Sequence, residues 1–234
     1  MLSVGAVLVD FDGTASTSDV AELLLRVFAE PSWADYDDAV DRGEMGLREA
    51  IQIQDAMLRA TGDELIAYAV EHCPMDPTFG PFVDWLSASG VEVALVSDGF
   101  GFYIQPILNA AGLGDLTVIS NEQMWAPDGR PGGMRFVNGH PVCVGCGTCK
   151  MNAVLTYRER HGPVAFVGDG QSDRYGALYA DVTFAKGELV DHCVRDGVPF
   201  VGWNDFDDVR RSLETMDTLP GSIEPVVCPG WTGQ

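Results

Sequence analysis

The chain has 234 residues, 46% of them hydrophobic, and a formal net charge of -21 at pH 7. This length supports one good core with a smaller appended module, and 35 acidic residues spread along the chain argue against nucleic acid as a partner. No apolar stretch reaches the roughly 20 residues of a membrane span, and the first residues already read as a strand, so we expect a cytoplasmic protein with no membrane partner.

The first predicted element is a buried strand over Val4–Val9, a nearly continuous apolar run that Asp10 follows. The next buried strand, Val91–Val96, comes only after a long segment of helical pattern. The helices expected in that segment span Val20–Ala29, Trp33–Arg42, Leu47–Ala60 and Glu64–His72, the last preceded by the capping box Thr61-Gly62-Asp63-Glu64.

One crossover between parallel strands needs a single helix, and this insert has several. We therefore expect residues 17–76 to form a helical cap domain beside the carboxyl end of a sheet. Residues 1–16 and 77–234 are expected to form the α/β core.

The rest of the chain alternates helices with short strands. The expected helices include Asp84–Ser89, Tyr103–Ala111 and Met151–His161, and the expected strands are Thr117–Ile119, Val164–Val167, Val182–Ala185 and Phe200–Val201. Gln123–Ala126 and Met134–Asn138, joined by a turn rich in glycine and proline, are typical of a hairpin outside the main sheet. The sequence thus predicts an α/β fold with a parallel sheet, an inserted helical cap and a small β-hairpin.

Two acidic motifs follow buried strands at distant points of the chain, Asp10-Phe11-Asp12-Gly13-Thr14 and Gly168-Asp169-Gly170-Gln171-Ser172-Asp173. Ligand sites in parallel sheets form at the carboxyl ends of strands, so we expect these carboxylates to meet. A carboxylate cluster is costly unless a cation neutralises it, and hard oxygen ligands suit Mg²⁺. An isolated Asp after a strand is more often a cap or turn residue, and that alternative stays open for Asp173.

Four segments occur in order: the Asp10 motif, Ser97-Asp98-Gly99 after an apolar strand, Lys150, and the Asp169 motif. Together they resemble the four motifs of the haloacid dehalogenase (HAD) superfamily of phosphatases, over about Val4–Ala185. The resemblance implies a HAD-like Rossmannoid core with a C1-type cap. The stretch Val96–Pro106 and the cysteines ahead of Lys150 look like the subgroup of 2-hydroxy-3-keto-5-methylthiopentenyl-1-phosphate phosphatases and phosphoethanolamine/phosphocholine phosphatases.

The resemblance implies a Mg²⁺-dependent phosphomonoesterase that acts on a small phosphorylated metabolite. Phosphoryl transfer needs a nucleophile, charge neutralisation and a proton for the leaving group, which suggests Asp10 as the nucleophile and Asp12 as the general acid and base. The residues expected to bind phosphate are Ser97, Asp98, Gly99 and Lys150. The metal ligands that the resemblance implies are Asp10, Asp12 through its carbonyl, Asp169, and Asp173 through water or as support of the shell.

Substrate contacts are less determined by the sequence. A substrate with a second anionic group would require an arginine in the cap, and Arg42 and Arg48 are the candidates. Such arginines more commonly form exposed ion pairs on helix surfaces. Because acidic residues outnumber basic ones in the cap, a cationic or neutral headgroup would be easier to admit. Phe100 could line an apolar pocket or pack in the core.

Cys143, Cys146 and Cys149, with His140 before them, could hold zinc or pack as a reduced loop. Two other functions stay open for the whole chain: a phosphotransferase or mutase using the same aspartyl phosphate, and a binding module without turnover. The natural substrate, the oligomeric state and the role of the tail are not determined by the sequence.

Overall fold

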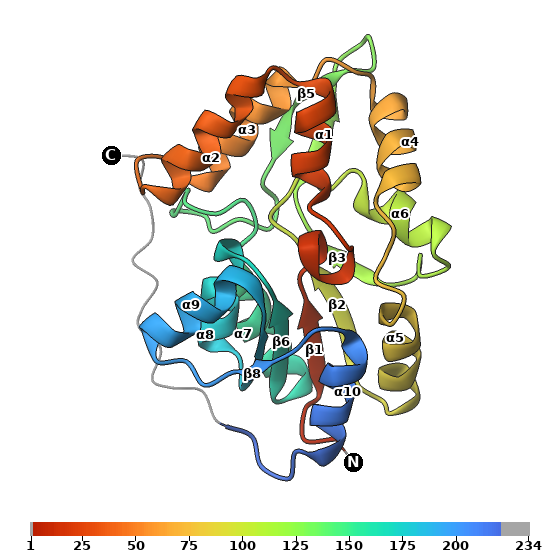
Figure 1. Ribbon diagram of the computed structural model, residues 1–234, viewed down its shortest axis with the longest axis vertical. Coiled ribbons are helices and arrows are strands. Elements are labelled where there is room, and N and C mark those ends of the chain that lie inside the picture. The colour runs from red at the N-terminus through yellow and green to blue at the C-terminus, as the bar shows by residue number, and fades with distance from the viewer. Residues whose placement is uncertain (1, 221–234) are drawn as a thin grey trace.

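The computed structural model describes residues 2–220 and has a parallel six-stranded sheet at its centre (Figure 1). Its strands, in spatial order, are β3 (Thr117–Ile119), β2 (Glu92–Val96), β1 (Ala6–Val9), β6 (Val164–Gly168), β7 (Val182–Ala185) and β8 (Val201–Gly202). Val9 lies opposite Leu95 of β2 on one side and Val167 of β6 on the other. The strand order reverses between β1 and β6, which is where open α/β sheets bind ligands.

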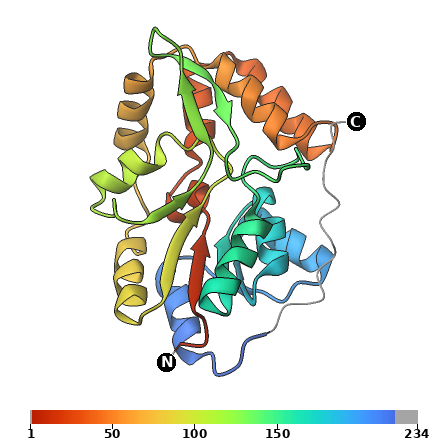
Figure 2. The same cartoon turned by 180° about the vertical axis from the view of Figure 1, so that it is seen from behind.

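Helices cover both faces of this sheet (Figures 1 and 2). They are α7 (Lys150–His161), α8 (Arg174–Tyr179) and α9 (Gly187–Asp196) on one face, and α5 (Phe79–Ala88) and α10 (Phe206–Thr215) on the other. Ala6 and Leu8 of β1 pack in the core under α7–α9, whereas Val7 and Val9 pack in the core under α5 and α10. Successive side chains of a strand alternate between faces, so a strand buried on both faces must be apolar at every position. The predicted α/β fold is confirmed.

The segment after β1 forms a helical insert, which lies beyond the carboxyl ends of the strands (Figure 1). It contains α1 (Val20–Phe28), a 3-10 turn (Pro31–Trp33), α2 (Ala34–Asp41), α3 (Leu47–Met57) and α4 (Gly62–His72). α3 ends three residues before the expected Ala60, because Leu58 N closes a tight turn on Asp55 O and Arg59 N donates to Phe28 O of α1 at 3.0 Å. Within the described residues, no helix combines the length and apolarity that crossing a bilayer requires.

A two-stranded hairpin of β4 (Glu122–Trp125) and β5 (Pro131–Arg135) lies outside the main sheet, as expected. It follows α6 (Ile104–Ala110) and β3 in the chain. β5 begins three residues earlier than predicted, because contacts with the insert fix this part of the chain in an extended form. Gly133 N donates to Asp55 Oδ2 at 2.9 Å, and Gly62 N donates to Gly129 O at 2.8 Å. The hairpin therefore packs on α3 and α4.

Candidate active site

The tips of β1 and β6 bring three carboxylates together. Oxygen atoms of Asp10, Asp169 and Asp173 lie within 4.8 Å of one another, and among residues 2–220 no other three His, Cys, Asp or Glu side chains approach so closely. The backbone at Gly13 has a φ of 72° and passes close to the Asp169 carboxylate. A Cβ on residue 13 would lie 2.6 Å from Asp169 Oδ2, so the motif needs glycine at this position. The two acidic motifs of the sequence thus meet, and their oxygens can hold a cation.

Charges at the strand tips depend strongly on one another. Burial raises the pKa of Asp10 well above its ordinary value, and the charge of Asp173 raises it further. Burial and Asp173 also raise the pKa of Asp169. Lys150 Nζ lies 2.5 Å from Asp10 Oδ1 and 2.6 Å from Asp173 Oδ1. Burial lowers the pKa of Lys150, but these carboxylates raise it above its ordinary value, so the lysine stays charged.

Asp12 is held by three donors from separate elements. Its Oδ2 accepts hydrogen bonds from Tyr103 OH at 2.9 Å and Ser97 Oγ at 3.2 Å, and its Oδ1 accepts one from Val20 N at 3.0 Å. Burial raises the pKa of Asp12 to about 6, although Val20 N–H and Tyr103 OH oppose the increase. An acid with a pKa near neutrality is suited to give and take protons at physiological pH.

Tyr103 is a site residue that the sequence analysis missed. It lies just before α6 in an aromatic stretch that is typical of a core, and its ring is fully buried. The available signal was chemical: a buried tyrosine needs a partner for its hydroxyl, and Asp12 is that partner.

The Ser97 motif makes two different sets of contacts. Ser97 Oγ accepts a hydrogen bond from Gly99 N at 3.1 Å and lies beside Asp12, at the strand tips. The carboxylate of Asp98 accepts a hydrogen bond from Thr148 N, two residues before Lys150. Burial raises the pKa of Asp98 to about 6, against the lowering effect of Lys150. The Asp98 side chain therefore connects the Ser97 loop to the segment that carries Lys150.

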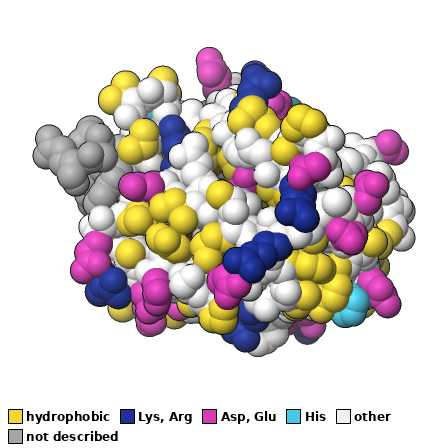
Figure 3. Space-filling view, turned by 90° about the horizontal axis from the view of Figure 1, so that it is seen from above, with side chains coloured by type: hydrophobic (Ala, Val, Ile, Leu, Met, Phe, Trp, Pro, Cys, Tyr) yellow, Lys and Arg dark blue, Asp and Glu magenta, His cyan; other side chains and the backbone are white. Residues whose placement is uncertain are grey.

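A cleft of about 900 Å³ separates the strand tips from the insert. The insert side of the cleft includes four acidic residues, Asp19, Glu22, Asp37 and Asp41, and apolar residues such as Leu25, Val40, Leu47 and Ile51. Arg174 also lines the cleft, and its guanidinium binds Asp196 at 2.5 and 3.0 Å. The outer surface at the insert end differs from this side of the cleft, because basic, acidic and hydrophobic side chains are intermixed on it (Figure 3).

The three residues predicted as possible substrate contacts, Arg42, Arg48 and Phe100, lie outside the lining of the cleft. Arg42 is exposed and pairs with Glu44 at 2.8 Å, and the Arg48 guanidinium binds the carbonyl oxygen of Cys146 at 3.1 Å. Phe100 is 1% exposed and stacks on Phe102, in the core. None of the three lines the cleft among the described residues.

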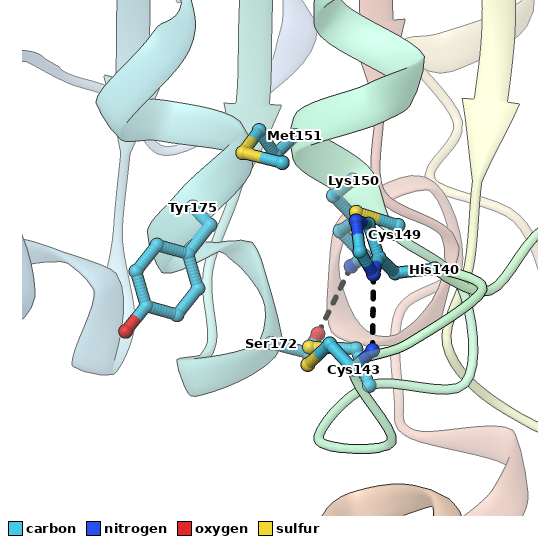
Figure 4. Close-up of a pocket in the computed structure, with 8 residues that line it drawn as sticks. His140, Cys143, Cys149, Lys150, Met151, Ser172 and Tyr175 are labelled. Atoms are coloured by element: carbon cyan, nitrogen blue, oxygen red, sulfur yellow. Dashed lines mark hydrogen bonds between the residues drawn. The ribbon is translucent and has the colours of Figure 1, made fainter. Parts of the chain in front are cut away.

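The cysteine motif borders a second, small pocket of about 80 Å³, next to Lys150 (Figure 4). Its lining residues are His140, Cys143, Cys146, Cys149, Lys150, Met151, Ser172 and Tyr175. The three cysteines form no disulfide, and His140 Nδ1 accepts hydrogen bonds from Val142 N at 3.2 Å and Cys143 N at 3.0 Å. These contacts use one ring nitrogen within the loop. Zinc binding by the cysteines and the packing of a reduced loop both stay open as predictions.

Comparisons with known proteins identify the family of the chain and similar sequences. The haloacid dehalogenase-like hydrolase family matches residues 7–177. The chain is 28% identical over 213 residues to the bifunctional enzyme MtnB/MtnX of Bacillus licheniformis, covering 89% of this chain and about half (49%) of that enzyme's length. It is 26% identical to a 2-hydroxy-3-keto-5-methylthiopentenyl-1-phosphate phosphatase of Brevibacillus brevis, covering 88% of this chain and 94% of that protein.

Solved structures share the fold. A phospho-aspartyl intermediate analogue of phosphoserine phosphatase superposes with a TM-score of 0.67 at 18% identity, covering 92% of this chain and 99% of that chain. The family match spans most of the chain and includes the Asp10, Ser97, Lys150 and Asp169 motifs. The chain therefore belongs to the haloacid dehalogenase-like hydrolase family.

Proposed function

We propose that this protein is a phosphatase, namely a Mg²⁺-dependent phosphomonoesterase that hydrolyses a small phosphorylated metabolite through an aspartyl phosphate on Asp10. The observation that carries the proposal is the contact of Asp10 with Lys150 at 2.5 Å, beside the oxygens of Asp169 and Asp173. Relatives named as phosphatases and a similar structure of a phospho-aspartyl intermediate analogue support it.

The donor set of the site fits Mg²⁺. Asp10, Asp169 and Asp173 offer only hard carboxylate oxygens, and their mutual repulsion favours a cation between them. The side chains of Asp10 and Asp169 and the carbonyl of Asp12 are the ligands we propose, with Asp173 as direct ligand or support. When bound, the ion supplies positive charge to the non-bridging phosphate oxygens.

Asp10 attacks phosphorus, so that a bond forms between phosphorus and the carboxylate oxygen while the ester bond to the leaving oxygen breaks. Asp12, protonated in part because burial raises its pKa to about 6, gives its proton to the leaving oxygen. The resulting carboxylate then takes a proton from water, which attacks the phosphoryl group and releases phosphate and free Asp10. Lys150 neutralises charge, and Ser97 Oγ with Gly99 N orients phosphate oxygens.

We also propose that residues 17–76 act as the substrate-selecting cap over a core of residues 1–16 and 77–234. The acidic side chains on the insert side of the cleft repel a second anionic group of a substrate. Binding such a group would require a positively charged side chain in the cleft. Neither Arg42 nor Arg48 supplies that charge, and Arg174 is already paired with Asp196. The substrate class we propose therefore has a cationic or neutral group besides its phosphate.

A panel of phosphorylated metabolites tested for Mg²⁺-dependent phosphate release examines this proposal. It should hold phosphoethanolamine, phosphocholine, phosphoserine and the methylthiopentenyl enol phosphate of the relatives. Asp10→Asn should lower kcat on the best substrate on the order of 10³-fold or more, because it removes the nucleophile. Asp84→Asn, an exposed change on α5, is the matched control and should leave kcat unaltered. Equal activity of the Asp10→Asn and Asp84→Asn variants would disprove the mechanism.

The same panel separates the alternatives. Free phosphate released from a single substrate in water supports hydrolysis, whereas turnover that requires a second hydroxyl compound supports a phosphotransferase or mutase. The absence of turnover, together with binding of phosphorylated ligands, would favour a non-catalytic module. Preference for substrates that bear a second carboxylate or phosphate would contradict the substrate class.

A further inference from the structure

We propose that Arg48 and Asp98 are positioning residues, which hold the cysteine segment (residues 140–149) from opposite sides and through it fix Lys150. This inference rests on the proposed role of Lys150 in phosphate chemistry. It gives Arg48 a function other than substrate binding, and it gives the cysteine segment a mechanical task between the insert and the catalytic lysine.

The insert side of the segment is held by the first turn of α3. Arg48 Nε donates to Cys146 O at 3.1 Å, and its terminal nitrogen Nη2 donates to His140 O at 3.4 Å. Its guanidinium carbon also lies 5.0 Å from the centre of the Phe136 ring. Leu47 N adds a hydrogen bond to the carbonyl oxygen of Gly145 at 3.0 Å. A guanidinium donates in several fixed directions at once, so a single side chain bridges two turns of the segment.

The core side of the segment is held by a buried polar cluster. The Asp98 carboxylate accepts the N–H of Thr148, and Thr148 Oγ1 donates to Asn121 Oδ1 at 3.4 Å. Asn121 Nδ2 in turn donates to the carbonyl oxygens of Asp98 and Gly99, both at 2.9 Å. A Cβ on Gly147 would lie 2.7 Å from Asp98 Oδ1, so the backbone approaches as closely as glycine permits. Buried polar groups with several partners make a rigid attachment.

Lys150 follows this segment directly, as the first residue of α7. Its side chain is 1% exposed, and its ammonium donates to Asp10, Ser172 and Asp173 at 2.5, 2.9 and 2.6 Å. Residues 140–149 contain no helix or strand, so their path depends on attachments such as those to Arg48 and Asp98. A movement of the insert that displaces Arg48 would therefore reach the lysine that neutralises the nucleophile.

Hydrolysis of p-nitrophenyl phosphate with saturating Mg²⁺ tests the inference in the full chain. Arg48→Met keeps an unbranched stem but removes all donors, and it should lower kcat about 10-fold, with KM changed much less, because a catalytic group displaced by about 1 Å costs up to roughly 10²-fold. Arg48→Lys, which restores one positively charged donor nitrogen, should recover part of the loss. Arg59→Met is the control, since Arg59 is an exposed insert arginine that pairs with Glu30 at 2.7 Å; its kcat should stay within about twofold of the unmodified protein.

A double-mutant cycle identifies the route of the effect. If Arg48 and Asp98 act through one segment, Arg48→Met combined with Asp98→Asn should lose less activity than the product of the two single losses. Asp98→Asn keeps the shape of the side chain, so the variant should fold, and thermal unfolding confirms it. Multiplicative losses, or equal kcat for Arg48→Met and Arg59→Met, would overturn the inference.

Alkylation of the cysteines gives a readout apart from activity. Loosening of the segment in Arg48→Met should increase the iodoacetamide labelling rate at Cys143 and Cys146 several-fold, measured by mass spectrometry, with no such change in Arg59→Met. Unchanged labelling in Arg48→Met also counts against the inference. If the unmodified protein showed no Mg²⁺-dependent hydrolysis, the proposed function would fail by itself, and the labelling comparison would still decide whether Arg48 holds the segment.

Discussion

The two sides of the cleft are built in different ways. On the sheet side, Asp10 is buried and Asp12 is half-buried, and each has fixed partners: Lys150 for Asp10, and Tyr103, Ser97 and a backbone N–H for Asp12. On the insert side, apolar surfaces alternate with acidic groups, among them Asp41, which is exposed. Fixed partners preorganise charge for chemistry, whereas a mixed, open lining can change with little cost to the fold. The comparison supports our proposal that the sheet side carries catalysis and the insert side selects the substrate.

Removal of the divalent ion should give the largest effect, and it should act on the sheet side. Chelation with EDTA should abolish phosphate release, and added Mg²⁺ should restore it. Mg²⁺ should also raise the melting temperature, since a ligand at 100 times its Kd stabilises the folded state by about 2.7 kcal/mol. Asp169→Asn should lose both responses, and Asp84→Asn should keep them. A melting temperature indifferent to millimolar Mg²⁺ would contradict a metal site at the strand tips.

Tyr103→Phe sharpens the comparison, because it removes one partner of Asp12 and leaves the insert side intact. The variant should lower kcat about 10-fold to 100-fold with little change in KM, since a general acid contributes about 10²- to 10⁴-fold and depends on its orientation. Steady-state kinetics on p-nitrophenyl phosphate measure both constants. Tyr68→Phe, on α4 where the ring stacks on His72, is the control for loss of a hydroxyl. Equal kcat values for the two variants would show that Tyr103 does not orient Asp12.

The smallest effect is expected from Asp55 of α3, on the insert side. Asp55 is 1% exposed, and burial raises its pKa, against the lowering effect of the hydrogen bond from Gly133 N. The folded state therefore keeps a proton that the unfolded chain loses at lower pH. This stabilising contribution is complete below the unfolded pKa of about 3.9 and disappears as pH rises through the folded pKa.

Asp55→Asn should remove this pH dependence, because an amide does not titrate and still accepts a hydrogen bond from Gly133 N. Urea unfolding between pH 4 and 8 should show that stability falls less with rising pH in the variant than in the unmodified protein. Asp63→Asn, an exposed change on α4, provides the reference slope. Parallel stability curves for all three proteins would show that Asp55 ionises alike in the folded and unfolded states.

Local patterns in the sequence predicted the part of the site that lies at the ends of strands, namely the Asp10 and Asp169 motifs. The runs before Asp10 and Asp169 are apolar at nearly every position, so they had to be central strands, and parallel strands end at the same edge of a sheet. Helix boundaries were less predictable. The end of α3 and the start of β5 depend on contacts with α1 and with Asp55, which lie far away in the sequence.

The sequence by itself determined the parallel sheet, the meeting of the acidic motifs and the family, because buried strands and short motifs carry their signal within a few residues. Only the tertiary structure decided the partners of side chains that act across elements: Tyr103 on Asp12, Asp98 on Thr148, and Arg48 on the cysteine segment. A buried hydroxyl, carboxylate or guanidinium needs a hydrogen-bond partner, and the sequence predicts that such a partner exists. It does not identify the partner, because that residue belongs to a distant element that packing brings into reach.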